Sequence, residues 1–171
     1  MRGTVRACVV IWLLVLAWLT SARTVVFQSN LALWTDASQK APTKPRPTLN
    51  YGRELELAGD VVRAEAFYRE VIAQVWDPRR PPYARLSGQA AAETNIAHLR
   101  LKAGKGASAL EILTFTLSYW PIYPYAKWNR GTIYWDLGLC EEARKDFEAA
   151  LQLDPALTVP PTPCVQKEGF E

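Results

Sequence analysis

The sequence predicts an all-α fold: an α-solenoid of three helix hairpins, preceded by a half-repeat and by one N-terminal membrane helix. Three observations predict it. Small and apolar residues recur with an offset of 34 residues, so that Ala109 and Leu113 match Ala143 and Phe147. A period of 34 residues is typical of a repeated pair of antiparallel helices. Glycines recur where such helices would turn, and an uncharged apolar run lies near the N-terminus.

Composition narrows the class of protein further. A chain of 171 residues suits one domain with a short appendage, and 49% hydrophobic with 22% charged residues is ordinary for a folded protein. The net charge is +3, but Arg2, Arg6 and Arg23 all flank the apolar run. The rest of the chain is therefore close to neutral. This argues against nucleic-acid binding, which needs a clustered positive surface.

Residues 1–22 contain the apolar run, which is uncharged from Ala7 to Ala22. Two interpretations stay open, because the run is short for a membrane span. It is either a membrane anchor extended by its flanking arginines, or a signal peptide cleaved after Ala22. With an anchor, the positive-inside rule places the N-terminus in the cytoplasm and the rest outside it. With cleavage, the product is secreted or periplasmic.

Residues 23–44 are predicted to form half of a repeat. Trp34, Ala37 and Pro42 stand in the register that ends the third repeat, so this stretch resembles the second helix of a hairpin. The apolar run lies where its partner helix would be. Cleavage of the run would leave this helix uncovered on one side, which favours the anchor.

Three complete hairpins follow, at residues 45–78, 90–123 and 124–157. Each has a small residue in its first helix (Gly52, Ala97, Gly131) and a glycine at its turn (Gly59, Gly104, Gly138). Residues 79–89 are expected to form an insert loop, since Pro-Pro marks a stiff surface connection. Residues 158–171 are expected to be a flexible tail, since three prolines prevent a long helix there.

The hairpins resemble the tetratricopeptide repeat (TPR) family from Pro45 to Pro155. The preceding LALWTDASQKAPTKPRPTLNYG also resembles the point where the last membrane helix enters the repeats of polytopic TPR proteins, some related to glycosyltransferases that use lipid-linked sugars. The chain resembles only the tail of such a protein. It lacks the loops that would hold a catalytic acid, so the transferase activity is not expected here.

We find no residues from which to assemble a catalytic, metal or cofactor site, and we do not expect an enzyme. His98 is the only histidine, which leaves no catalytic triad and no paired-histidine metal site. The sequence has no glycine-rich phosphate loop. Cys140 and Cys164 lie near the C-terminus, and a disulfide between them is plausible only in an oxidising compartment.

The resemblance implies a concave groove lined by the first helices of the hairpins. Twelve residues stand at its lining positions: Arg46, Leu49, Arg53, Thr94, His98, Leu101, Lys102, Tyr125, Trp128, Thr132, Trp135 and Asp136. Eight of these residues form the predicted partner-binding site: Arg46, Arg53, His98, Lys102, Tyr125, Trp128, Thr132 and Trp135. Basic residues gather at one end and aromatic residues at the other. This suits an extended peptide with an acidic group and apolar side chains. The alternative is that Trp128 and Trp135 simply pack against a neighbouring helix.

Asn50, Asn95 and Asn129 share one position of the repeat. Some TPR proteins use this asparagine in a clamp for a peptide carboxylate. Leu49 and Arg53 replace two other residues of that clamp, so we expect the asparagines to join adjacent repeats by hydrogen bonds instead.

The expected function is protein–protein interaction by a membrane-anchored scaffold or assembly factor that holds a peptide or protein in its groove. Two alternatives remain: an accessory or remnant C-terminal part of a membrane glycosyltransferase-type protein, and a secreted soluble TPR protein. Solenoids usually end in a polar capping helix. The sequence after Pro155 cannot supply one, so the last hairpin is expected to need a cover from the tail, a second copy of the chain, or another protein.

Overall fold

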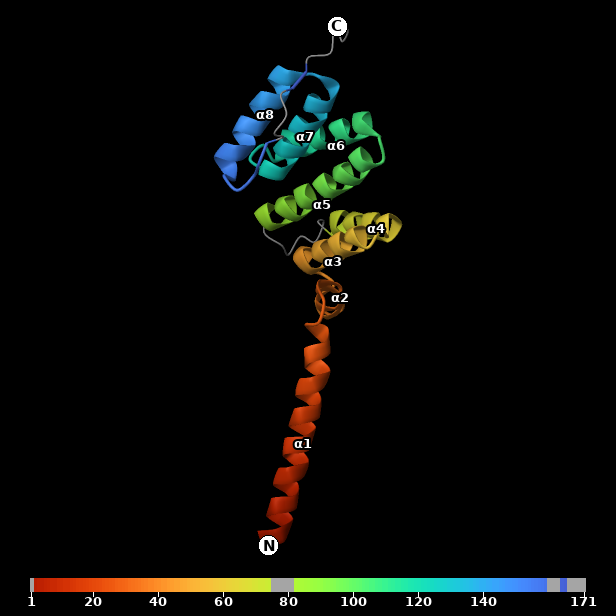
Figure 1. Cartoon of the computed structure of the whole chain (residues 1–171), viewed down its shortest axis with the longest axis vertical. Coiled ribbons are helices and arrows are strands. Elements are labelled where there is room, and N and C mark those ends of the chain that lie inside the picture. Colours follow the sequence, from red (N-terminus) through yellow and green to blue (C-terminus); the bar gives the residue numbers. More distant parts are fainter. Residues whose placement is uncertain (1, 75–81, 160–163, 166–171) are drawn as a thin grey trace.

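The structure, a computed structural model, describes residues 2–74, 82–159 and 164–165 of the chain. In this part the chain forms eight helices and no strand, which confirms the all-α solenoid (Figure 1). In chain order the helices are α1 (Arg2–Val26), α2 (Asn30–Lys40), α3 (Pro45–Leu57), α4 (Val61–Gln74), α5 (Pro82–Lys102), α6 (Gly106–Tyr119), α7 (Pro124–Leu137) and α8 (Cys140–Leu153).

Three hairpins stack side by side along the chain: α3/α4, α5/α6 and α7/α8. Each turns at a glycine with a positive φ: Gly59 at +85°, Gly104 at +73° and Gly138 at +77°. Residues with a side chain rarely adopt this backbone conformation, which glycine reaches without strain. The next residue then closes the helix end: the Leu139 amide donates to the Tyr134 carbonyl at 2.8 Å, and the other two turns repeat this bond.

The periodic residues form the core between the hairpins. One cluster joins α3, α4 and α5, and its buried members are Leu55, Ala64, Tyr68, Val71, Ala92, Ile96 and Leu99. A second joins α5, α6 and α7, and its buried members are Ala97, Ala109, Leu113, Leu117, Ala126 and Ile133. Burying these side chains is the main source of stability in such a stack, because each hairpin exposes an apolar flank when alone.

The prediction of an insert loop over 79–89 is wrong from residue 82 onward. Helix α5 begins at Pro82, so residues 82–89 extend the first helix of the middle hairpin. Proline is tolerated in the first turn of a helix, where its missing N–H would have no partner in any case. Residues 79–81 lie outside the described part of the chain. The close approach of α5 to α3 begins at Gly88, where an added Cβ would lie 3.1 Å from Pro45.

Helix α1 does not cover α2, which corrects the expected pairing within the half-repeat. Figure 1 shows α1 projecting away from the stack as a long rod. It meets α2 through the ion pair of Arg23 with Asp36, whose atoms are 3.5 Å apart, and no residue of α2 is fully buried. Helix α2 packs on α3 instead. The argument that cleavage would uncover α2 is therefore not supported by the packing.

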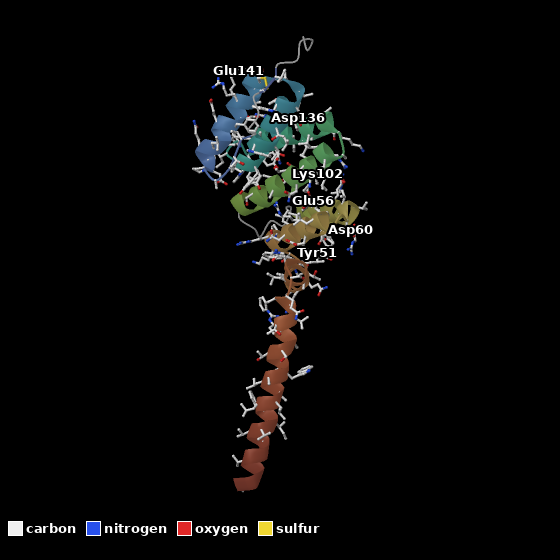
Figure 2. The ribbon with its side chains drawn as sticks, in the orientation of Figure 1. Tyr51, Glu56, Asp60, Lys102, Asp136 and Glu141 are labelled. Atoms are coloured by element: carbon white, nitrogen blue, oxygen red, sulfur yellow. A yellow bond between two sulfur atoms is a disulfide. The ribbon has the colours of Figure 1, made fainter. Side chains whose placement is uncertain are left out.

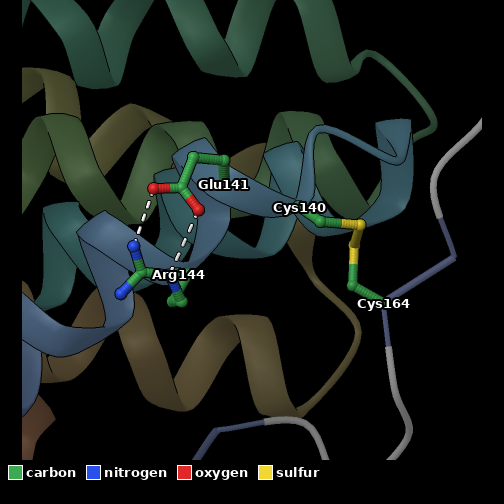
Figure 3. The surroundings of a disulfide bond; sticks show 4 residues. All are labelled: Cys140, Glu141, Arg144 and Cys164. Carbon is green, nitrogen blue, oxygen red and sulfur yellow. Dashed lines mark hydrogen bonds and ion pairs between the residues drawn. A yellow bond between two sulfur atoms is a disulfide. The ribbon is translucent and has the colours of Figure 1, made fainter.

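The end of the stack also differs from expectation. The outer face of α8 is already polar. Arg144 pairs with Glu141 at 2.7 Å (Figure 3). It also pairs with Glu148 at 2.6 Å. Among the exposed side chains of this helix only Leu153 is a large hydrophobic one. The last hairpin is thus capped by its own charged surface. Self-association through this end of the stack stays a prediction.

Two described residues of the tail, Thr158 and Cys164, are bonded to the last hairpin. The prediction that all of 158–171 is flexible is wrong for these two residues. Trp128 Nε1 donates a hydrogen bond to the Thr158 carbonyl at 2.7 Å. Cys164 forms a disulfide with Cys140, the first residue of α8 (Figure 3).

Candidate functional site: a groove on the first helices

A cavity of about 470 Å³ lies along the first helices of the three hairpins. Helix α3 contributes Arg53, Glu56 and Leu57 to its lining. The remaining lining residues come from α5, from α7 with the residue before it, and from the chain after α8: Thr94, Asn95, His98, Lys102, Tyr123, Tyr125, Trp128, Asn129, Ala156, Leu157 and Thr158. The first helices bring these side chains together because α5 contacts both α3 and α7. We call this cavity the groove.

The polar end of the groove is organised around the Glu56 carboxylate, which is largely buried. Lys102 Nζ donates to its Oε1 at 2.8 Å, and His98 Nε2 lies 3.5 Å from the same oxygen. The Tyr68 hydroxyl donates to the other oxygen at 3.4 Å. Glu56 and Lys102 thus join α3 to α5 across the groove (Figure 2).

Burial changes the titration of two groups here. It lowers the pKa of His98, assisted by the nearby Lys102 and Arg53 and opposed by Glu56. His98 is therefore neutral at pH 7. Burial also raises the pKa of Tyr68, and the Glu56 carboxylate raises it further. The fixed charges of the polar end are then Glu56 against Lys102 and the exposed Arg53, which makes no ion pair with any described residue.

Several polar groups at the middle of the groove lack partners. Thr94 is 3% exposed, and its hydroxyl makes no hydrogen bond. The Asn95 and Asn129 amides line the groove, and neither makes a side-chain hydrogen bond with the residues that the structure describes. The expectation that these asparagines and Asn50 join adjacent repeats is therefore wrong. A buried polar group without a partner costs free energy, and a ligand that pairs with the Thr94 hydroxyl recovers it.

The aromatic end is formed by Tyr123, Tyr125 and Trp128. The two tyrosine rings lie 5.9 Å apart, and burial raises the pKa of Tyr123 to about 12. Trp128 turns its indole N–H to the Thr158 carbonyl, so the chain after α8 lies against this end. An aromatic wall with a directed N–H donor suits a ligand with apolar side chains and a free backbone carbonyl.

Of the eight residues on which we base the predicted site, five line the groove: Arg53, His98, Lys102, Tyr125 and Trp128. The other three, Arg46, Thr132 and Trp135, are not among its lining residues. Arg46 is exposed in the first turn of α3, and Thr132 donates its hydroxyl to the Trp128 carbonyl at 3.1 Å. Trp135 packs on Phe147, with ring centres 5.9 Å apart.

Trp128 both lines the groove and packs against the neighbouring helix, the two roles that the sequence left open. Its ring lies 6.3 Å from Phe147, and its edge faces the groove. Sequence reasoning missed Glu56, Leu57, Tyr123 and the chain at 156–158. Glu56 follows Arg53 by three residues, which places both on one face of a helix, so a search for helical neighbours would have found it.

Comparison with known protein families gives a match over part of the chain. A family model described as tetratricopeptide repeat matches residues 94–157, from the middle of α5 to just beyond α8. No curated protein matches the chain. The match covers the second and third hairpins, and the first repeats their turn and their stacking. The repeat match and the all-helical stack of hairpins together support a tetratricopeptide repeat protein.

Proposed function

We propose that this chain is a membrane-anchored scaffold or assembly factor that holds an extended segment of a protein partner in its groove. Tetratricopeptide repeats are in general protein-interaction modules, and catalysis is not their usual role. The observation that carries the proposal is the groove itself, where α5 and α7 present polar groups without partners in the described chain, between a charged end and an aromatic end.

The charges favour a partner with one acidic group. Lys102 is already paired with Glu56, whereas Arg53 is exposed beside it with its guanidinium free of ion pairs within the described chain. The polar end therefore carries a net positive charge of about one. A carboxylate from the partner would accept from Arg53, while its backbone would pair with Asn95 and Asn129. Apolar side chains of the partner would pack on the aromatic end.

Two features support an anchor that places the repeats outside the cytoplasm. Helix α1 holds a stretch of 19 residues, Cys8–Val26, with mean hydropathy 2.0 and no burial against the stack. This corresponds to about 28 Å of helix, close to the hydrocarbon thickness of a bilayer. The Cys140–Cys164 disulfide is stable in an oxidising compartment, on the side opposite to the basic N-terminus.

Crosslinking in native membranes tests the proposal. We expect the full chain to capture a partner, and Arg53→Glu to lower the yield about tenfold, because it reverses a charge of the groove that pairs with no described residue. The matched control is Arg46→Glu on the same helix, which lies outside the groove and should leave capture unchanged. Equal loss in both variants would refute the groove as the binding surface. Intact mass analysis of the same preparation tests the anchor, since loss of residues 1–22 would contradict it.

A further inference from the structure

The chain after α8 forms a short strap, which we define as residues 154–159. It begins with a turn, in which the Leu157 amide donates to the Asp154 carbonyl at 3.2 Å and the Ala156 amide to the Asp154 carboxylate at 3.1 Å. From Leu157 to Val159 the strap has neither helix nor strand. Ala156, Leu157 and Thr158 line the groove beside the aromatic end. The strap thus forms part of the groove wall, and it occupies the Trp128 N–H donor that an external peptide would use.

The contact between the strap and Trp128 recognises backbone. The indole N–H donates to the Thr158 carbonyl at 2.7 Å, a distance typical of a strong bond. The bond does not involve the Thr158 side chain, so any peptide carbonyl in this place would satisfy the donor. What selects the ligand must therefore be the conformation of its chain and the fit of its side chains against the two tyrosines.

The sequence of the strap favours an extended conformation. Pro155 is its second residue, and Val159 is followed in the sequence by Pro160 and Pro161. A residue before proline is driven away from the helical region towards extended backbone. Its only charged residue is Asp154, at its start. Aromatic-lined grooves bind proline-rich segments of this kind, because an extended chain that is already ordered loses little entropy on binding.

We propose that the aromatic end of the groove binds extended, proline-flanked peptide segments of low charge, and that the strap is the resident occupant that such a segment must displace. This rests on the proposed function, which it deepens by naming the ligand class for one end of the groove. The charged end remains available for the acidic group of the same partner.

The disulfide decides how strongly the strap competes. Through it Cys164 is held at the start of α8, while Leu153 at the end of α8 holds the other side of the segment. A segment fixed at both ends stays close to its site at a high effective concentration. Without the disulfide the strap keeps one attachment and competes less well with a free peptide.

A labelled peptide tests this on the full chain in detergent micelles. The probe is fluorescein-labelled DPALTVPPTP, the sequence of residues 154–163, and binding is followed by fluorescence anisotropy. We expect it to bind a Cys140→Ser, Cys164→Ser double variant at least about tenfold more tightly than the oxidised wild type. In the double variant, adding Trp128→Phe should weaken binding about tenfold, the effect of one well-made hydrogen bond.

Two matched controls separate recognition from folding. Trp135→Phe changes a tryptophan of the same helix that packs on Phe147 outside the groove, and it should leave binding unchanged. A peptide with its prolines replaced by alanine should bind about tenfold more weakly, because its ordering costs more entropy.

Equal binding to the oxidised wild type and the double variant would overturn the role of the strap. Equal loss with Trp128→Phe and Trp135→Phe, or equal binding of the alanine peptide, would overturn the ligand class, as would an absence of binding to the double variant. The Arg53→Glu crosslinking experiment does not involve the strap. If it succeeds while the peptide fails, the proposed function stands and this inference does not.

Discussion

The first and third hairpins meet the same packing problem with different neighbours. In each, a glycine of the first helix faces an aromatic ring of the second. An added Cβ on Gly52 would lie 2.7 Å from Tyr68 Cε1, and one on Gly131 would lie 3.0 Å from Phe147. The helices approach closely in both because the glycine has no side chain to separate them.

The surroundings of the two rings differ. Tyr68 lies between α3 and α4 in a core that α5 completes with Ala92, Ile96 and Leu99. Phe147 belongs to the last hairpin, whose outer face meets solvent. Two rings of its own hairpin cover it, Trp128 and Trp135.

The difference shows what a terminal hairpin must do. The first hairpin shares the core around its ring with α5, whereas the ring of the last hairpin is covered by residues of that hairpin itself. In the last hairpin a bidentate ion pair adds to this, from Arg130 to Asp146 at 2.6 and 2.9 Å. The first hairpin instead links its core to the groove, because Tyr68 reaches Glu56.

Truncating the two rings gives the largest expected effect. Phe147→Ala and Tyr68→Ala should each cost about 3–5 kcal/mol, from lost burial and the cavity left behind. Phe147→Ala should loosen mainly α7 and α8. Tyr68→Ala should loosen α3, α4 and α5 together, since its core spans all three. Hydrogen exchange of the full chain in detergent, analysed by helix, measures both patterns.

Tyr68→Phe is the matched control, since it keeps the ring and removes only a long hydrogen bond, and it should cost less than about 1 kcal/mol. If Phe147→Ala loosened α5 as much as α7 and α8, the packing around Phe147 would extend to α5 after all, and the contrast between the hairpins would be lost.

Adding a methyl group to each of the two glycines tests the same comparison with a smaller expected loss of stability. Gly52→Ala should cost about 1–3 kcal/mol, because the ring in its way has no exposed surface and no room to retreat. Gly131→Ala should cost less, since Phe147 needs to yield only a few tenths of an ångström. Both gain roughly 0.5–1 kcal/mol from the helix preference of alanine. Urea unfolding measures the free energy of unfolding of both variants. A larger loss of stability in Gly131→Ala than in Gly52→Ala would contradict the expected order.

The sequence predicted what depends on neighbours within one hairpin. The glycine turns and the all-helical stack follow from local spacing, because a residue and its partner across a hairpin keep a constant separation. The same reasoning failed at Pro82. There Pro-Pro indicates a loop, but a proline in the first turn is equally compatible with a helix.

The groove was only partly predictable, since a repeat position sets the direction of a side chain but not what it meets. Trp128 and Trp135 stand on one helix at positions with the same expected role, yet only Trp128 lines the cavity. The strap leaves no periodic signal at all. It depends on a contact between Trp128 and Thr158, thirty residues apart, and on a disulfide whose formation depends on the compartment.

The smallest expected effect is a difference between the hairpins in how their stability depends on pH. His98 is the only histidine, so it is the side chain whose ordinary pKa lies between pH 5.5 and 7.5. Burial first, then Lys102 and Arg53, lower its pKa in the folded chain, with Glu56 opposing. The unfolded chain, with a pKa near 6.5, therefore takes up the proton first as the pH falls. Stability is complete above about pH 6.5 and declines below it, until the folded histidine also becomes protonated.

We expect this decline in α3 and α5, which meet at His98 and Glu56, and not in the last hairpin. His98→Gln should remove it, because glutamine keeps the polarity of the site without titrating. Hydrogen exchange at pH 5.5, 6.5 and 7.5, corrected for the intrinsic exchange rate, measures the difference by helix. A decline of equal size in α7 and α8, or one that persists in His98→Gln, would show that acid acts elsewhere and that the first hairpin is not coupled to the groove through this histidine.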